Sequence, residues 1–445
     1  MRVLVYGLGR SGLAAGLLAA SQGNRVAFFD QRDEGEDIDR ALAEGWERPP
    51  EPTRWAADLC IAAPGVPINH PDLVALRGTG VETIGEVEWV YRSVRVPIIG
   101  ITGTAGKSTV TAWTTHILRQ AGHPAVAGGN IDPPLCSVAS AGTPLIAELS
   151  SFQLERCPTL RPKVAAVLNL GEDHLDRHGS LEAYQAAKRN AVANQGAGDT
   201  MVIAASDQTL AEWAYDSGAR VLHFGTDRSC DGKLIGGRLV IADREVCNQD
   251  ELSVAGEHNR TNALAAALIA YAYGLPPAAL EEGLRTFAGL PGRFRREGVI
   301  GGVEIISDSY ATRPLSVRVA LESCRKPVVW IGGGKDKGAS FNDLAGLVRE
   351  RVTLFIGVGA SGRDLADSIG RWVCSTACTE ASGREALRCA LATGLEHLGA
   401  GGEGSGTVLL APMAASFDQF RDYRHRAEIF ATLVREEEER WTATC

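Results

Sequence analysis

The chain has 445 residues, of which 45% are hydrophobic, and a formal net charge of −9 at pH 7. This length supports two or three domains with sizeable cores, and the acidic balance does not favour a surface that binds nucleic acid. No apolar run approaches the length of a membrane span, and the N-terminus leads directly into a strand pattern. We therefore expect a cytoplasmic protein that binds neither nucleic acid nor membrane.

Ten cysteines are scattered along the chain, and their spacing does not predict a zinc site. Cys374, Cys378 and Cys389 lie closest together, but no second close pair completes a zinc-binding pattern. We expect reduced thiols with mostly structural roles.

The N-terminal segment has the pattern of a Rossmann-like domain. A short apolar strand over Arg2 to Val5 precedes the turn G-L-G-R-S-G at residues 7–12 and a helix pattern, and a second strand over Arg25 to Phe29 ends on Asp30. This order is typical of a βαβ unit that binds a phosphate-bearing ligand at its glycine-rich turn. NAD, FAD and a nucleotide sugar all fit the pattern at this point.

A second domain begins near Arg95, where a strand over Val96 to Ile101 leads into G-I-T-G-T-A-G-K-S-T at residues 100–109. We interpret this segment as a phosphate loop, because its glycines let backbone amides converge on phosphate oxygens and Lys107 supplies a positive charge. The hydroxyl of Ser108 or Thr109 can bind Mg²⁺. Ile101 stands where the strict G-x-x-x-x-G-K-[ST] pattern has its first glycine, so the loop follows the variant T-G-T-x-G-K-[ST].

Polar residues follow two predicted strands of this second domain. The strand around Leu145 to Ala147 delivers Glu148, and the strand over Val164 to Leu170 delivers the motif G-E-D-H-L-D-R-H, which contains His174. Open α/β sheets gather their chemistry at such strand ends. A serine hydroxyl and a carboxylate beside ATP phosphates form a suitable Mg²⁺ site, so Ser108 and Glu148 are the first candidates.

A helix pattern then places Lys188 fourteen residues beyond His174. A helical lysine is usually a solvated charge, and its ammonium group cannot bind a metal ion. Carbamylation would convert it to an anionic ligand, but spacing alone does not indicate this. A hairpin-like region from Leu222 to Val246 follows, and a long helix then begins with Asn259 and Asn262 near its N-terminal end.

A third domain begins near Leu290 and again alternates strands with helices. The pattern predicts strands over Val328 to Ile331, Leu354 to Val358 and Val408 to Leu410, a helix over Arg384 to Leu398, and a terminal helix. The predicted fold class is therefore α/β with three domains. These are a Rossmann-like N-terminal domain over residues 1–94, a central P-loop ATPase-like domain over residues 95–289 and a Rossmann-like C-terminal domain over residues 290–445.

Nine motifs, in this order and spread over nearly the whole chain, resemble those of the Mur ligases. They are G-I-T-G-T-A-G-K-S-T, G-G-N-I, E-L-S-S-F-Q-L-E, E-D-H-L-D-R-H with A-A-K downstream, G-E-H-N-x-x-N-A-L-A-A, L-P-x-R-F, D-S-x-A-T, G-G-K-D-K-G and A-S-F-D-Q-F. Within that family, the set is most similar to the ligases that add D-glutamate.

The resemblance implies an ATP-dependent ligation of D-glutamate to UDP-N-acetylmuramoyl-L-alanine in peptidoglycan synthesis. The alanyl carboxylate attacks the γ-phosphate of ATP to give an acyl phosphate and ADP, and the amine of D-glutamate then displaces phosphate. Phosphorylation gives a poorly electrophilic carboxylate a leaving group. Two Mg²⁺ ions and a monomeric enzyme are also expected.

The family motifs further imply a role for individual residues. Lys107, Glu148, His174 and Lys188 are expected to act in catalysis, with Ser108 and Glu148 on one Mg²⁺ and with His174 and a carbamylated Lys188 on the second. The implied ATP contacts are Gly103, Thr104, Ala105, Gly106, Lys107, Ser108, Thr109, Asn262, Arg293 and Asp308. The implied uridine-nucleotide contacts are Arg10, Ser11, Gln31, Arg32, Gly65 and Asn130, with His174 also near the substrate. The implied contacts for D-glutamate are Thr312, Lys337, Ser416, Phe417 and Tyr423.

Several positions depart from the family motifs. Ala105 replaces the usual asparagine of the phosphate loop, and Tyr310 stands where D-S-K-A-T has its lysine. Arg313, which follows Thr312, could return that positive charge. Gly292 replaces a frequent histidine, and Asp132 a frequent glycine. We hypothesise that the first two changes alter turnover or substrate affinity.

Other functions are compatible with parts of the pattern. Mur-type ligases that add another amino acid and folate polyglutamylating ligases share the phosphate loop, but the D-N-P-R motif of the diamino-acid ligases is absent and the N-terminal turn argues against a folate substrate. An NAD-dependent dehydrogenase would leave the G-K-S-T segment without a role. Ala105 and Tyr310 keep a weakly active, nucleotide-binding relative open.

Overall fold

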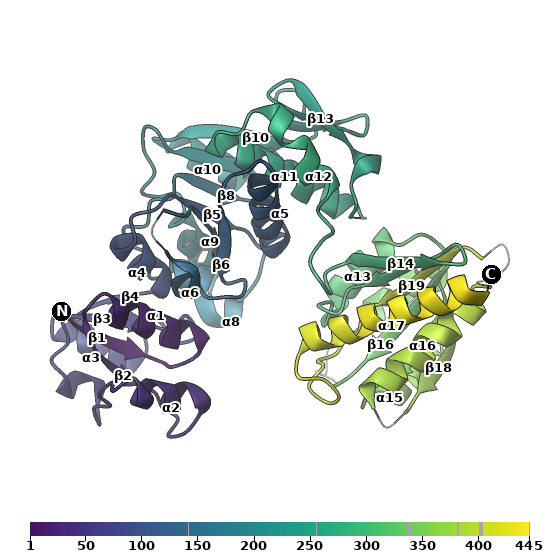
Figure 1. Cartoon of the computed structure of the whole chain (residues 1–445), viewed down its shortest axis with the longest axis horizontal. Coiled ribbons are helices and arrows are strands. Elements are labelled where there is room, and N and C mark those ends of the chain that lie inside the picture. The colour runs from purple at the N-terminus through teal and green to yellow at the C-terminus, as the bar shows by residue number, and fades with distance from the viewer. Residues whose placement is uncertain (141, 255, 336–339, 381, 400–403, 445) are drawn as a thin grey trace. The chain divides into compact units, whose positions relative to one another are not determined.

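The computed structural model describes residues 1–445 except residues 141, 255, 336–339, 381, 400–403 and 445. Contacts divide the chain into two compact units, the first comprising residues 1–252 and 260–286 and the second residues 253–259 and 287–445. Both units combine sheets of mainly parallel strands with helices, so the predicted α/β class is confirmed (Figure 1).

The N-terminal part of the first unit is a parallel four-stranded sheet in the order β2-β1-β3-β4. Its strands are β1 (Arg2–Tyr6), β2 (Arg25–Phe29), β3 (Leu59–Ala62) and β4 (Glu82–Ile84), and its helices are α1 (Arg10–Ser21), α2 (Glu36–Ala43), α3 (Pro71–Gly78) and α4 (Glu86–Ser93). A side-chain carbon at Gly12 would lie 1.9 Å from the carbonyl oxygen of Gly7, so only glycine lets α1 start this close to β1.

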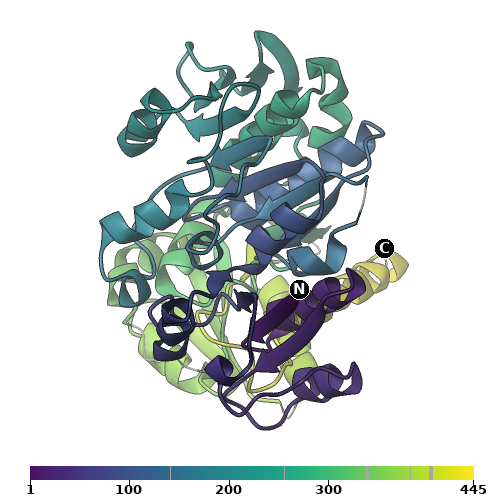
Figure 2. The same cartoon turned by 90° about the vertical axis from the view of Figure 1, so that its left-hand side faces the viewer.

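The central part of the first unit is a nine-stranded sheet in the order β13-β12-β11-β10-β9-β8-β5-β7-β6. Its strands are β5 (Ile98–Thr102), β6 (Val126–Gly129), β7 (Leu145–Glu148), β8 (Val164–Val167), β9 (Thr200–Ala204), β10 (Arg220–Gly225), β11 (Gly232–Ile235), β12 (Arg238–Ile241) and β13 (Arg244–Asn248). Strands β11, β12 and β13 pair antiparallel, as the hairpin-like pattern predicted, and the other pairs are parallel. Figure 2 shows the twist of these blue and teal strands.

Helices connect the parallel strands of the central sheet, and others follow its last strand. They are α5 (Lys107–Gln120), α6 (Leu135–Val138), α7 (Ser151–Leu154), α8 (Leu175–His178), α9 (Leu181–Arg189), α10 (Gln208–Tyr215), α11 (Glu257–Tyr273) and α12 (Glu281–Arg285). Every residue of β5 and β7 is buried, which is typical of parallel strands covered on both faces.

One hydrophobic core joins the two sheets of the first unit. It includes Val5 and Phe28 of the N-terminal sheet, Trp89 of α4, and Leu149 and Val167 of the central part. Because this core is continuous, contacts group both sheets into one unit, although the sequence predicts a domain boundary at residue 94.

The second unit contains a six-stranded sheet in the order β14-β15-β19-β16-β17-β18. Its strands are β14 (Arg295–Ile300), β15 (Val303–Ser307), β16 (Val328–Gly333), β17 (Val352–Val358), β18 (Cys374–Cys378) and β19 (Gly406–Leu410), and its helices are α13 (Pro314–Ser323), α14 (Ala345–Arg351), α15 (Gly362–Ile369), α16 (Gly383–His397) and α17 (Tyr423–Thr444). Among the described strands of this sheet, only β14 runs antiparallel to its neighbour. Helix α17, in yellow, packs along β14 and α16 (Figure 1).

No helix within the described residues is both long and apolar enough to cross a membrane. The sequence did not single out β3, β4, β6, β9, β14, β15 or β18. The strands that it did predict have similar bounds in the structure, except β8. That strand ends at Val167, so the predicted strand over Val164 to Leu170 is too long, and residues 168–170 form the loop that approaches the phosphate loop.

Candidate active site

The phosphate loop connects β5 to α5 and is bonded to its own lysine. Gly103 and Gly106 have φ angles of 153° and 84°, which disfavour any residue with a side chain. Lys107 Nζ donates to the carbonyl oxygens of Gly103 and Thr104, at 2.8 and 3.0 Å. The loop therefore places the positive charge of Lys107 and a glycine-shaped backbone turn at the N-terminus of a 14-residue helix, where a phosphate group binds well.

Asn169, which follows β8, holds the middle of this loop. Its Oδ1 accepts hydrogen bonds from the backbone N–H groups of Thr104 and Ala105 at 3.0 and 2.8 Å, and its Nδ2 donates to the carbonyl oxygen of Ala105 at 3.2 Å. The Thr104 hydroxyl accepts from Gly171 N–H at 2.9 Å. Sequence reasoning missed Asn169, although its position directly after a buried strand was a usable signal.

Glu148 lies at the end of β7 and is 1% exposed. Its Oε1 accepts a hydrogen bond from Asn130 Nδ2 at 2.7 Å, whereas its buried Oε2 has no partner among the described residues. A buried carboxylate oxygen without a partner is costly unless a donor or a cation binds it. Ser108, 5% exposed in the first turn of α5, supplies the second oxygen of the predicted set. The donor set therefore fits Mg²⁺.

Lys188, on α9, is 1% exposed and points toward the phosphate loop. Its Nζ donates to the carbonyl oxygen of Gly103 at 2.8 Å and to Thr102 Oγ1 at 3.3 Å. Burial, with a smaller contribution from the charge of Lys107, lowers the pKa of Lys188 to about 7. Much of this amine is therefore neutral at neutral pH, which is the form that can react with carbon dioxide.

His174 directly precedes the short helix α8, as its N-cap residue, with a left-handed φ of 53°. Its Nε2 lies 3.4 Å from Asp173 Oδ2, and its ring packs on Phe152 with centroids 4.8 Å apart. Asparagine, aspartate and histidine adopt this backbone region more readily than bulkier residues. His174 lies in the loop between β8 and α8, seven residues after Val167 at the observed end of β8, and not directly at a strand end.

Arg177 joins this turn to the N-terminal sheet of the same unit. It donates to the carbonyl oxygens of Gly65 and Val66 at 3.2 and 2.9 Å and pairs with Glu155 at 3.1 Å. The loop that contains the predicted substrate residue Gly65 is thus fixed to the motif that contains His174. Sequence reasoning did not assign this role to Arg177.

Four of the predicted uridine-nucleotide residues, Arg10, Ser11, Gln31 and Arg32, lie around the glycine-rich turn and the loop after β2, whereas Gly65 follows β3 and Asn130 follows β6. Arg10 pairs with Asp132 at 2.8 Å, and Ser11 contacts the buried Glu86, whose pKa burial raises to about 7. Gln31 Nε2 lies 3.2 Å from His70 Nε2.

Asp30, the acidic residue of the dinucleotide fingerprint, is fully used within the protein. Its Oδ2 accepts from Leu8 N–H at 2.6 Å, and its Oδ1 accepts from the backbone N–H of Arg32 at 2.9 Å and from Arg32 Nε at 3.0 Å. These bonds lower the pKa of Asp30. The carboxylate that would bind a ribose in an NAD enzyme instead joins two loops, which argues against a dehydrogenase.

In the second unit, the predicted ATP contact Arg293 packs on Tyr310, the residue that replaces the lysine of the family motif. The Arg293 guanidinium carbon lies 3.7 Å from the centroid of the Tyr310 ring, and the Tyr310 ring meets that of Tyr423 edge-on with centroids 5.0 Å apart. Asp308 accepts from Phe294 N–H at 3.3 Å, and burial raises the pKa of Asp308 to about 7. The family motif has a lysine at position 310, so tyrosine there means one positive charge fewer. Its ring instead packs against the guanidinium of Arg293.

Arg426, which sequence reasoning missed, holds the segment around Ser309 through hydrogen bonds. It is 2% exposed and donates to Ser309 Oγ and to the Ser309 carbonyl oxygen, both at 2.9 Å. Gly292, with φ 70°, has Ala427 so close that a side-chain carbon would lie 2.7 Å from it. A histidine does not fit at position 292 without a shift of the backbone or of α17.

The remaining predicted residues of the second unit differ in exposure. Ser416 is buried, Phe417 is 70% exposed, and Thr312 and Tyr423 are half-buried. Lys337 lies outside the described residues.

The cysteines differ from expectation at one pair. Cys378, at the end of β18, and Cys389, on α16, are joined by a disulfide with their Cα atoms 6.2 Å apart, so the expectation of reduced thiols is wrong here. The packing of α16 on the sheet brings together two residues that are 11 apart in sequence. The remaining described cysteines are free, and all but Cys374 are buried.

Two family models match the chain. The Mur ligase middle domain matches residues 101–270, and the glutamate ligase domain of Mur ligases matches residues 292–411. These ranges contain the phosphate loop of the first unit and the Arg293 to Tyr310 segment of the second.

Proteins of known name match over nearly the full length. The chain is 41% identical over 431 residues to the UDP-N-acetylmuramoylalanine--D-glutamate ligase of Thermus thermophilus, covering 97% of this chain and 96% of that protein. It is also 41% identical over 442 residues to the ligase of the same name from Deinococcus radiodurans, covering 97% and 92%.

Solved structures share the fold at lower identity. UDP-N-acetylmuramate-alanine ligase MurC from Thermotoga maritima matches with a TM-score of 0.59 and 21% identity, covering 98% of this chain and 100% of that one. MurF ligase from Thermotoga maritima in complex with ADP matches with a TM-score of 0.57 and 16% identity, covering 92% and 94%.

Proposed function

The chain belongs to the Mur ligase family, and on that premise we propose that it joins D-glutamate to UDP-N-acetylmuramoyl-L-alanine at the expense of ATP, in the synthesis of peptidoglycan precursors. The observation that carries this proposal is the pairing of a lysine-bearing phosphate loop with the buried Glu148, whose Oε2 lacks a partner among the described residues. Together they suit transfer of a phosphoryl group from ATP.

The reaction begins with attack of the alanyl carboxylate on the γ-phosphate of ATP. The bond from the γ-phosphorus to the bridging oxygen breaks, ADP leaves, and an acyl phosphate forms. Lys107 balances charge on the transferring phosphoryl oxygens, and the backbone N–H groups of the loop orient the phosphates. Asn169 keeps the loop in this shape through its three hydrogen bonds.

Ser108 and Glu148 would hold one Mg²⁺, and His174 with a carbamylated Lys188 would hold a second. When bound, Mg²⁺ supplies positive charge that neutralises phosphate oxygens. The lowered pKa of Lys188 supports carbamylation, because only the neutral amine has the lone pair that bonds to carbon dioxide.

The second step joins the amino acid. The neutral amine of D-glutamate attacks the acyl carbon, an amide bond forms, inorganic phosphate leaves, and the nitrogen loses a proton. We assign Thr312, Lys337, Ser416, Phe417 and Tyr423 to the binding of D-glutamate and Arg293 and Asp308 to the nucleotide. We also propose that the enzyme acts as a cytoplasmic monomer.

The proposal is tested by measuring phosphate release with each substrate omitted in turn. Phosphate release should require ATP, UDP-N-acetylmuramoyl-L-alanine and D-glutamate together. Release with a different amino acid in place of D-glutamate would retain the chemistry and refute the specificity. ATP binding without turnover under any of these conditions would indicate a nucleotide-binding relative without ligase activity.

A further inference from the structure

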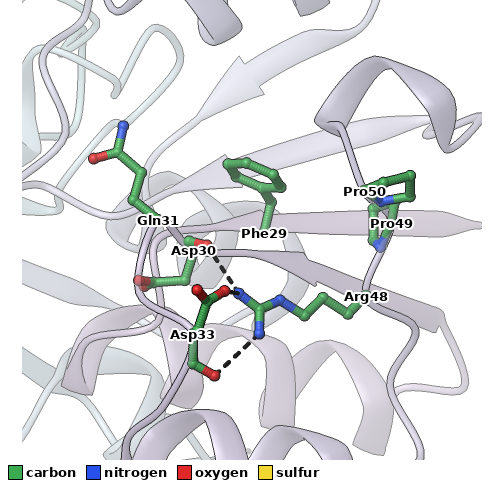
Figure 3. A pocket seen from close by; sticks show the side chains of 7 residues that line it. All are labelled: Phe29, Asp30, Gln31, Asp33, Arg48, Pro49 and Pro50. Atoms are coloured by element: carbon green, nitrogen blue, oxygen red, sulfur yellow. Dashed lines mark hydrogen bonds and ion pairs between the residues drawn. The ribbon is translucent and has the colours of Figure 1, made fainter.

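The loop after β2, at residues 30–33, is held by an arginine that no motif singled out. Arg48 donates through Nη2 to the carbonyl oxygens of Arg32 and Asp30, at 2.7 and 3.3 Å, and to Asp33 Oδ1 at 3.1 Å. Its Nη1 donates to the Asp33 carbonyl oxygen at 3.2 Å. One side chain therefore bonds to three of the four residues of the loop. Figure 3 shows its bonds to Asp30 and Asp33.

Arg48 is itself held by its neighbours on β2. The preceding Glu47 accepts from Phe28 N–H at 2.9 Å and so extends the edge of β2. The Arg48 guanidinium lies 5.8 Å from the centroid of the Phe28 ring, and its side chain is 28% exposed. The arginine therefore connects a rigid strand edge to the loop, and little of its own length is free to move.

The hydrogen bonds of Arg48 go to backbone carbonyl oxygens and to Asp33, and within the described residues none of them goes to the side chain of Gln31 or Arg32. Figure 3 shows Gln31 projecting away from the Arg48 guanidinium. Arg32 folds back to Asp30 and to the Leu8 carbonyl oxygen at 2.8 Å, which links the loop to the glycine-rich turn. A pocket of about 370 Å³ beside the loop is lined by Phe29, Asp30, Gln31, Asp33, Arg48, Pro49 and Pro50.

We propose that Arg48 is a positioning residue for the uridine-nucleotide substrate. It fixes the backbone of residues 30–33 so that Gln31 and Arg32 are already arranged for the nucleotide before it binds. This inference rests on the proposed function, because it takes the loop as part of the nucleotide-binding site. The substrate thereby avoids the entropic cost of ordering the loop.

The chemistry of the side chain limits what can replace it. A guanidinium presents five N–H donors in a fixed plane and can reach several carbonyl oxygens at once, whereas an ammonium group presents three donors from one point. Lysine at position 48 would keep the charge and lose most of the bonds. The geometry therefore predicts that charge alone does not restore the function of Arg48.

The test compares Arg48→Ala and Arg48→Lys with the control Arg54→Ala. Arg54 is an exposed arginine of the same connecting segment, and its side chain bonds only to Glu51 in the described structure. For each protein, kcat and the KM values for the three substrates are measured, together with calorimetric binding of UDP and the unfolding temperature.

Arg48→Ala should raise the KM for UDP-N-acetylmuramoyl-L-alanine and the Kd for UDP about tenfold, and Arg48→Lys should raise them about fivefold. The values of kcat, of KM for ATP and of KM for D-glutamate should stay within about twofold, as in Arg54→Ala. An unchanged KM for the uridine substrate in both Arg48 variants, or an equal loss in all parameters, would overturn the inference. Should Arg48→Ala fail to fold, Arg48→Lys decides alone. Failure of the wild-type protein to bind UDP would instead refute the proposed function.

Discussion

The phosphate loop of the first unit holds Lys107, and Tyr310 of the second unit holds Arg293, but the two cationic side chains are held by different interactions. Lys107 bonds to backbone carbonyl oxygens of its own loop, whereas Arg293 lies on the face of Tyr310, 3.7 Å from the ring centroid. Backbone geometry follows from glycines at fixed spacing, and it tolerates variation in the exposed side chains. A ring that supports a cation depends on one side chain, so Arg293 should be more sensitive to substitution of Tyr310 than the phosphate loop is to substitution of its exposed Ala105.

The largest expected effect is in the first unit, at Glu148. Glu148→Gln keeps the size of the side chain and removes the charge of the unpartnered Oε2, so we expect kcat to fall about 100-fold to 1000-fold. The unfolding temperature should not fall, because a buried charge is removed. The exposed Glu212→Gln on α10 is the matched control, and similar kcat values for the two variants would contradict the assignment of Glu148.

Lys188→Ala should also reduce kcat about 100-fold or more, since it removes the proposed carbamate. Short carboxylates such as acetate should restore part of the activity by entering the space left by the side chain. The control Lys163→Ala alters an exposed lysine. Its kcat should stay close to that of the unaltered protein and should not increase when acetate is added. Full activity of Lys188→Ala without any additive would refute a role for this lysine.

The pKa of Lys188 adds a dependence on pH. Its lowered pKa of about 7 means that the amine is mostly protonated at pH 6 and mostly neutral at pH 8. At a fixed concentration of dissolved ¹³C-labelled carbon dioxide, the carbamate signal in a ¹³C spectrum should therefore increase as the pH rises through 7. A signal that is absent at pH 8, or that is equally strong in Lys188→Arg, would contradict carbamylation at this position.

A smaller effect is expected in the second unit, where the ring of Tyr310 matters more than its hydroxyl. Tyr310→Leu should raise the KM for ATP about threefold to tenfold, because Arg293 loses its aromatic support, and Tyr310→Phe should change it less than twofold. Tyr310→Lys would bring a second positive charge to Arg293, so we expect it to raise the KM for ATP even though it restores the lysine of the family motif. Equal KM values in the Leu and Phe variants would show that the ring does not position Arg293.

The smallest effect is expected for Ala105→Asn. Both backbone groups of Ala105 are already bonded to Asn169, and its side chain is exposed. We expect kcat and the KM for ATP to change less than about threefold. A larger gain would mean that the missing asparagine, and not the shape of the backbone, limits the phosphate loop.

The sequence was sufficient for the α/β class, the phosphate loop and the strand-end position of Glu148, because glycine spacing and hydrophobic periodicity are local signals. His174 instead lies in the loop after β8, which ends at Val167. The hydrogen bonds by which Asn169, Arg48 and Arg426 hold their loops could not be predicted from such local signals. Each depends on contacts between residues that are separated in sequence, such as Ala105 and Asn169, which are 64 positions apart. The Cys378 to Cys389 disulfide was missed for a related reason, since it requires the packing of a helix on a strand.

The most direct test of the central claim is the fate of oxygen in the substrate carboxylate. UDP-N-acetylmuramoyl-L-alanine labelled with ¹⁸O in its alanyl carboxylate is incubated with ATP, Mg²⁺ and D-glutamate, and the inorganic phosphate is analysed by mass spectrometry. Ligation through an acyl phosphate transfers one labelled oxygen to each phosphate released, with the other retained in the amide. Phosphate without the label, formed alongside ADP, would show that the phosphate loop hydrolyses ATP without activating the carboxylate and would contradict the account.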